Sequence, residues 1–274
     1  AYEIRPRDWS SDVCSSDLNN PGFQRAVHAI RLGIRQEGVK EWNYTAGLVD
    51  AQGKRGRMTD REKQAAAQWA CEMEIWDRCI SSTERTSQYD VNHRFPMPFK
   101  EEVLSRTRDI NLEAAYVYGL IRQESRFVIN ARSSVGASGL MQVMPRTAKW
   151  TAKKIGLKNF QPDQLNQRDT NIAIGTGYLK LVLDNFHGSL PMAAAAYNAG
   201  PSRPRKWRNG PLLEGAIWTE CIPFTETRDY VKKVLSNTTA YAALITGEPQ
   251  SLKARLGKIG PREKSEPEDD NELP

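Results

Sequence analysis

The chain has 274 residues, of which 39% are hydrophobic and 26% are charged, and its formal net charge is +6. This composition is typical of a globular protein with one large domain or two smaller ones. The longest apolar stretches, such as Met192–Tyr197, are far too short to cross a bilayer, so no membrane span is predicted. The positive charge suits an anionic partner such as nucleic acid or a bacterial cell wall. No helical stretch interleaves Lys and Arg with aromatic residues, which disfavours nucleic acid.

Residues 1–18 resemble the translation of a common DNA-sequencing adapter. One reading frame of the adapter spells residues 8–18, and its other fixed part spells residues 1–3 and the start of Ile4. We therefore interpret residues 1–18 as non-native and expect the native chain to begin near Asn19. On this interpretation the original N-terminus, with any signal peptide, is missing.

A helical domain is predicted over residues 19–99. Apolar residues recur at helical spacing near its start, at Phe23, Val27, Ile30 and Ile34. A capping box at Thr59–Glu62 precedes an Ala-rich helix that we expect to run from residue 63 to residue 80. Pro96 and Pro98 then force an extended connector, which marks the domain boundary.

Three cysteines lie outside the adapter-like segment: Cys71, Cys79 and Cys221. Their odd number and their spacing argue against a zinc site and against a disulfide framework. Cys71 and Cys79 would lie two turns apart on an unbroken helix, which is too far for a disulfide. We therefore expect buried free thiols.

A second helical domain is predicted over residues 100–250. The patterns indicate helices over residues 101–106, 112–124, 145–154, 169–185, 190–199 and 227–244. Residues 133–139 are Gly-rich and form a predicted loop, and no stretch alternates as a strand should. Residues 251–274 are a polar, acidic tail that we expect to be disordered at its end. The predicted fold class is therefore all-α.

Glu124 lies on the apolar side of a predicted helix. It follows Val117, Leu120 and Ile121 at helical spacing, on the stripe that should face the core. A carboxyl group there loses solvation, which raises its pKa toward the range useful for proton donation. The alternative is a helix end whose last side chain reaches water.

Four short segments follow Glu124 in an informative order. They are Glu124-Ser125, Gly139-Leu140-Met141-Gln142, Ala196-Tyr197-Asn198-Ala199-Gly200 and Ile222-Pro223-Phe224-Thr225-Glu226-Thr227-Arg228. In this order they resemble the soluble lytic transglycosylases, whose catalytic domain is similar to goose-type lysozyme. The resemblance covers residues 112–244. Residues 19–99 resemble the linker domain of the large periplasmic members, the remnant of an α-superhelix.

The resemblance implies cleavage of the bond between N-acetylmuramic acid and N-acetylglucosamine in peptidoglycan. Most glycosidases use two carboxylates, but the four segments supply no obvious second one. The family is understood to use one glutamate twice, first as acid and then as base, so that 1,6-anhydromuramoyl ends form without water. This role is implied for Glu124. The alternatives are a hydrolytic muramidase and a non-catalytic murein-binding protein.

The resemblance also implies substrate contacts for Ser125, Ser133, Gln142, Met144, Tyr197, Asn198, Glu226 and Tyr230. The amide of Gln142 suits N-acetyl or hydroxyl groups. Tyr197 is expected to bond the glutamate or to stack on a sugar, and Tyr230 to face the same cleft one turn after Glu226.

Five of these residues also have a simple structural interpretation. Ser125 and Ser133 can cap a helix end or a loop, and Met144 can fill the core. Asn198 can support the turn that follows it. Glu226 can be a charge that the dipole of its helix stabilises.

No metal or cofactor is predicted. The three histidines, His28, His93 and His187, share no spacing with a nucleophile, and no phosphate loop or calcium loop occurs. The expected partners are peptidoglycan glycan strands and, beside them, cell-wall synthesis complexes. The family resemblance implies a periplasmic location.

Overall fold

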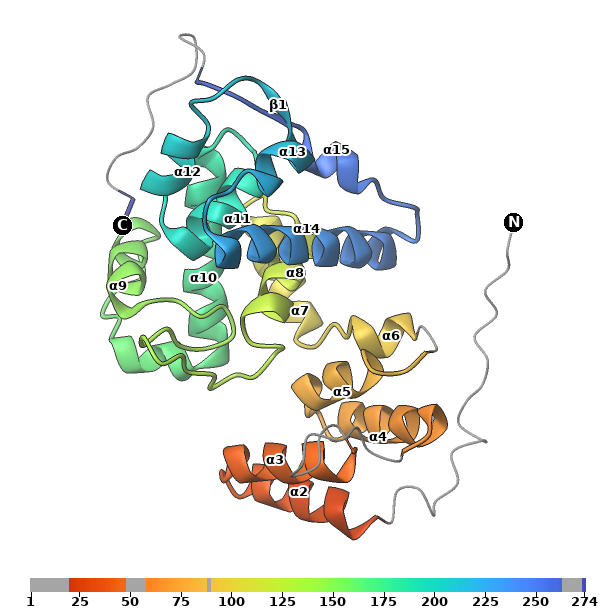
Figure 1. The fold of residues 1–274 in the computed structure, drawn as a ribbon. Helices are drawn as coiled ribbons and strands as arrows, with labels where there is room; N and C mark the ends of the chain where they lie inside the picture. Colours follow the sequence, from red (N-terminus) through yellow and green to blue (C-terminus); the bar gives the residue numbers. More distant parts are fainter. Residues whose placement is uncertain (1–19, 48–57, 88–89, 263–272) are drawn as a thin grey trace. The chain divides into compact units, whose positions relative to one another are not determined.

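The computed structural model describes residues 20–47, 58–87, 90–262 and 273–274 (Figure 1). Residues 1–18, interpreted as adapter translation, lie outside this part. The chain divides into two compact units, residues 1–96 and 97–274. The described residues are mostly helical, and their only strands are two residues long. The predicted all-α fold class is confirmed.

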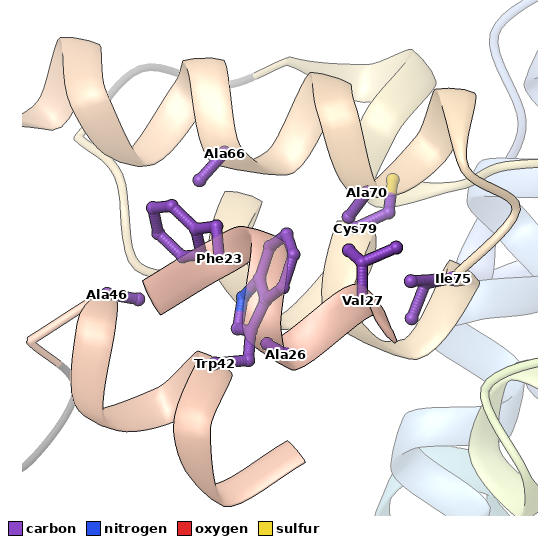
Figure 2. Packing of buried hydrophobic residues seen from close by; sticks show 9 residues of the cluster. All are labelled: Phe23, Ala26, Val27, Trp42, Ala46, Ala66, Ala70, Ile75 and Cys79. Atoms are coloured by element: carbon purple, nitrogen blue, oxygen red, sulfur yellow. The ribbon is translucent and has the colours of Figure 1, made fainter. Parts of the chain in front are cut away.

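The first unit is built from five helices in its described part. They are α2 (Pro21–Arg31), α3 (Arg35–Thr45), α4 (Asp60–Glu72), α5 (Trp76–Thr83) and α6 (Val91–Arg94). Phe23 and Trp42 meet at its centre, with ring centroids 4.6 Å apart (Figure 2). The indole N–H of Trp42 donates to Ser82 Oγ, so its one polar atom is satisfied inside the core. The capping box at Thr59 and Glu62 is present as predicted.

The prediction of free thiols at Cys71 and Cys79 is wrong, because these residues form a disulfide. The expected unbroken helix ends at Glu72, and α5 begins at Trp76. Glu74 between them has a φ of 59°, in the left-handed region that turns the chain back. This turn brings the two Cα atoms to 5.0 Å, within disulfide range. Cys221 is free, as predicted, but it is exposed and not buried.

The second unit contains the remaining helices and both strands. Its helices are α7 (Lys100–Asp109), α8 (Ala114–Glu124), α9 (Pro145–Lys154), the 3-10 helix η2 (Pro162–Asn166), α10 (Arg168–Asn185), α11 (Leu190–Ala199), α12 (Ser202–Trp207), α13 (Gly215–Glu220), α14 (Thr225–Thr246) and α15 (Leu252–Leu256). The Ala-rich helix α11 is buried from Pro191 to Ala196. It therefore lies in the core of this unit. No helix in the described part has the length and hydropathy to cross a membrane.

Helices α8 and α14 pack against each other at unusually short range (Figure 1). A Cβ on Gly119 would lie 2.5 Å from Thr238 Oγ1 and 2.8 Å from the Thr238 backbone nitrogen. Asn237 bridges the same region, because it accepts from Arg122 and donates to the Gly119 carbonyl. Glu124 lies one turn beyond this close approach, so its helix end is held firmly against α14.

Part of the predicted acidic tail belongs to the fold of the second unit. The strand β2 (Lys258–Ile259) pairs antiparallel with β1 (Leu213–Glu214), and Ile259 is buried. The prediction that no strand forms is wrong at these residues, because two-residue strands are too short to show alternation. The predicted disorder at the end of the tail falls on residues 263–272, which lie outside the described residues.

Candidate active site

Glu124 is the last residue of α8, and the apolar stripe before it is fully buried, as predicted. Its own side chain is only partly exposed to solvent. Burial raises the pKa of Glu124 to about 7. A hydrogen bond from Tyr230 opposes this rise, and the negative charge of Glu226 adds to it. Glu124 therefore exchanges a proton close to neutral pH.

Tyr230 is the hydroxyl partner of the glutamate. Its O–H donates to Glu124 Oε1 at 2.5 Å, and the ring is buried on α14. Burial, followed by the charge of Glu124, raises the pKa of Tyr230 well above its ordinary value. The tyrosine therefore keeps its proton and acts as a fixed donor to the carboxylate.

Tyr197 lies beside the glutamate but donates its hydroxyl elsewhere. Its O–H bonds the carbonyl oxygen of Met141 at 2.9 Å. The pKa of Tyr197 is raised by burial and then by the charge of Glu124, which places the two groups near each other. Of the two expected roles, the hydrogen bond to the glutamate belongs to Tyr230. Stacking on a sugar stays a prediction for Tyr197.

The turn at residues 139–142 contacts this group through Met141. Within it, the amide nitrogen of Gln142 donates to the carbonyls of Ala131 and Gly139 at 3.0 and 2.8 Å. The amide oxygen of Gln142 is left as the atom that can face a ligand. Met144 is 41% exposed, which argues against a role as core filler.

Asn198 and Glu226 mark the junction between α11 and α14. Asn198 Oδ1 accepts from the Thr227 hydroxyl at 2.7 Å, which ties the end of one helix to the start of the other. Glu226 is exposed in the first turn of α14. Its charge nevertheless raises the pKa of Glu124, so the two carboxylates are close enough to interact.

The two serines serve the local backbone. Ser125 follows α8 and its hydroxyl points back to the Ile121 carbonyl at 3.4 Å. Ser133 Oγ accepts from the Ala137 N–H at 2.9 Å and closes the 133–137 loop. Both bonds agree with the capping interpretation. Substrate contact stays a prediction for both serines.

Two residues near the site are not among the predicted ones. The ring of Tyr178 packs on Tyr197, with centroids 5.4 Å apart. Asn171 is completely buried and bonds the 139–142 turn. Its only signal in the sequence is an amide at the start of the apolar helix predicted over residues 169–185.

The titratable side chains of the described residues include no group of three or more His, Cys, Asp or Glu that could hold a metal ion. The interacting carboxylates at the site are Glu124 and Glu226. What the arrangement offers is a proton donor with a pKa near neutrality, one phenol that supports its charged form, and one neighbouring carboxylate.

Comparison with known proteins agrees with this geometry. Residues 103–211 match the transglycosylase SLT domain family, and residues 221–250 match the soluble lytic transglycosylase helical domain family. The second match lies over α14, not over the predicted linker domain.

Curated relatives match along most of the chain. The soluble lytic murein transglycosylase of Salmonella typhimurium (strain LT2) is 33% identical over 255 residues, which are 92% of this chain and 38% of the relative. Its counterpart in Escherichia coli (strain K12) is 32% identical over 257 residues, with the same two coverages. The chain thus spans less than half the length of these relatives.

Solved structures share both fold and sequence with the chain. Lytic transglycosylase Slt of Pseudomonas aeruginosa, solved as an inactive glutamate-to-glutamine mutant, superposes with a TM-score of 0.78 at 33% identity, over 90% of this chain and 39% of that one. The 70 kDa enzyme SLT70 of Escherichia coli superposes with a TM-score of 0.75 at 30% identity, over 92% of this chain and 40% of that one. The chain belongs to the soluble lytic transglycosylase family.

Proposed function

We propose that the chain is a lytic murein transglycosylase in which Glu124 acts first as acid and then as base. The observation that carries the proposal is the state of the Glu124 carboxyl. It is partly exposed, yet it is desolvated enough that its pKa rises to about 7. A group with this pKa is populated in both protonation states near neutral pH, which a residue used twice requires. The matched relatives are named as soluble lytic murein transglycosylases, which supports the substrate class.

In the first step, the protonated Glu124 donates to the oxygen between C1 of N-acetylmuramic acid and C4 of N-acetylglucosamine. The C1–O bond breaks, the N-acetylglucosamine side leaves with its C4 hydroxyl, and positive charge develops at C1. The substrate's own N-acetyl group stabilises this charge. Tyr230 stabilises the carboxylate that the step creates, because its hydroxyl already donates to Glu124.

In the second step, the Glu124 carboxylate removes the proton of the C6 hydroxyl of the same muramoyl residue. The oxygen attacks C1 and closes the 1,6-anhydro ring, and Glu124 regains the proton that it gave up. No water is consumed, so one carboxylate completes the cycle.

Glu226 distinguishes this mechanism from that of a muramidase. A hydrolytic enzyme needs a second group to hold the attacking water, and Glu226 is the carboxylate whose charge reaches Glu124. We propose that Glu226 instead contacts the glycan or its peptide from the cleft wall. In the same way, we assign substrate contacts to Gln142, Met144, Tyr197 and Asn198.

Digestion of purified murein, with the product masses measured, tests the proposal. We expect products one water lighter than reducing-end muropeptides, and we expect Glu226→Gln to release the same products. Reducing ends from the wild type, lost in Glu226→Gln, would establish the muramidase. Binding of murein without any product would establish the non-catalytic protein.

The periplasm is the proposed location. The Cys71–Cys79 disulfide supports it, since disulfides persist in oxidising compartments such as the bacterial periplasm. Cell-wall synthesis complexes are the proposed protein partners, because strand cleavage and strand insertion act on the same polymer. Co-purification from cross-linked cells, with Glu124→Gln as bait, tests this part.

A further inference from the structure

The side-chain amide of Asn171 is buried, and its hydrogen bonds join the backbone segments around the 139–142 turn. It lies in the first turn of α10 and has no exposed surface. Its Oδ1 accepts from the Met141 N–H at 2.8 Å. Its Nδ2 donates to the carbonyls of Ser138 and Leu165, both at 2.9 Å. One side chain therefore joins the 139–142 turn, the residue before it and η2.

The turn fits against α10 so closely that its shape depends on this helix. Gly139 has a φ of 81°, and a Cβ there would lie 2.0 Å from Asn171 Nδ2. Gly175, one turn after Asn171, leaves room for Met141, because its own Cβ would lie 2.4 Å from Met141 Sδ. Two features of α10 therefore hold the turn in place. The amide of Asn171 bonds it, and the absence of a side chain at Gly175 leaves room for Met141.

Met141, whose N–H donates to Asn171, also contacts the candidate active site. The Met141 carbonyl accepts from Tyr197, and the charge of Glu124 raises the pKa of Tyr197. The Gly139 carbonyl accepts from Gln142, whose free amide oxygen is a candidate substrate contact. An unbroken series of hydrogen bonds therefore runs from Asn171 through Met141 to the tyrosine beside the glutamate.

We propose that Asn171 is a positioning residue, which sets the 139–142 turn so that Gln142 and Tyr197 can receive the glycan. The inference rests on the proposed function for the identity of the ligand. Only a planar amide offers one acceptor and two donors to the three backbone groups. Aspartate keeps the shape but loses both donors, and alanine loses all three bonds. Because Glu124 is held by α8 and α14 and not by this turn, its proton transfer should be untouched.

The test combines Asn171→Asp and Asn171→Ala with Leu179→Ala as a control. Leu179 is buried on the same helix, so its truncation destabilises the unit without removing a bond to the turn. Affinity for peptide-free murein glycan strands is measured in the Glu124→Gln background, where nothing is cleaved. Hydrogen exchange of residues 138–144 is measured in the same proteins, below the unfolding temperature of each.

We expect both Asn171 variants to bind the strands at least tenfold more weakly and to exchange the turn amides faster than the Leu179→Ala control. In the enzyme that retains Glu124, KM should rise in both Asn171 variants, and the alkaline limb of the pH profile should stay unchanged. Affinity and exchange equal to those of the control would overturn the positioning role. A wild type that binds strands without cleaving them would refute the proposed function, yet the affinity comparison would still decide the role of Asn171.

Discussion

The Tyr230 hydroxyl donates to Glu124 Oε1, and this bond opposes the effect of burial on the glutamate. Burial favours the protonated carboxyl that the first step of the proposed mechanism needs. The phenol favours the carboxylate that its second step needs. The balance of these two influences, with a further rise from Glu226, holds the pKa of Glu124 at about 7.

Removing the phenol should shift the pH profile upward. In Tyr230→Phe the carboxylate loses its donor, so the pKa of Glu124 rises and the alkaline limb of kcat/KM moves to higher pH. We expect kcat to fall by tenfold or more, on the order seen when one donor to a developing charge is lost. Tyr118→Phe is the control, since Tyr118 is buried on α8 and donates to the Pro98 carbonyl instead. A profile that moves equally in both variants would contradict this role.

Removing the neighbouring carboxylate should shift the same limb downward. The charge of Glu226 raises the pKa of Glu124, so Glu226→Gln lowers it and activity declines from a lower pH. Asp229→Asn removes an exposed carboxylate from the same helix, one that pairs with Lys232, and should leave the limb in place. This prediction fails if the alkaline limb moves to higher pH in Glu226→Gln, or if Asp229→Asn moves it as far as Glu226→Gln does.

The desolvated carboxyl of Glu124 should make the second unit less stable as the pH rises. The pKa of Glu124 is about 7 in the fold against an ordinary 4.5, so between these values the folded chain binds a proton that the unfolded chain has lost. Stability therefore falls from about pH 4.5 to pH 7, by roughly 3 kcal/mol at most. Glu124→Gln carries no charge and should be more stable than the wild type at pH 8 but not at pH 4. Calorimetry at both values checks this, and a pH-independent difference would refute it.

The disulfide should stabilise the first unit alone. The double variant Cys71→Ser/Cys79→Ser opens a loop whose ends lie eight residues apart in the sequence. We expect the loss of this cross-link to destabilise that unit by about 2–3 kcal/mol. Murein cleavage at a temperature where both units are folded should be unchanged, because the site residues all lie in the second unit. Cys221→Ser serves as the control, since Cys221 is free. Loss of activity without unfolding would contradict this separation.

Gly119 should resist substitution because of the approach of α14. Gly119→Ala places a methyl group against Thr238 and the Val234 carbonyl, and overpacking of this kind destabilises by about 1–3 kcal/mol. Gly210→Ala meets no atom within 4 Å and is the matched control. Urea unfolding distinguishes them, and equal midpoints would argue against the close packing.

The sequence predicts the fold class and the position of Glu124 because both depend on local pattern. The stripe of Val117, Leu120 and Ile121 places Glu124 at the end of a helix whose preceding turns are buried, and the structure has it there with its own side chain partly exposed. The hydrogen-bond partner of Glu124 depends instead on how the helices pack. Tyr197 and Tyr230 are both tyrosines in recognised segments, and which of them reaches Glu124 depends on how α8 meets α14.

The misses have physical causes of the same kind. The helix through Cys71 and Cys79 reads as continuous, and only a left-handed Glu74 breaks it and brings the thiols together. Asn171 resembles any polar residue at a helix start until the 139–142 turn folds onto it. Strands of two residues are defined by their pairing and not by a pattern of their own.

Digestion of murein in water enriched in the heavy oxygen isotope tests the central claim most directly. If Glu124 uses the C6 hydroxyl of the substrate as the acceptor, the released anhydromuropeptides carry no solvent oxygen, and Glu124→Gln releases none of them. Incorporation of one heavy oxygen per cleavage, or turnover that survives Glu124→Gln, would contradict it.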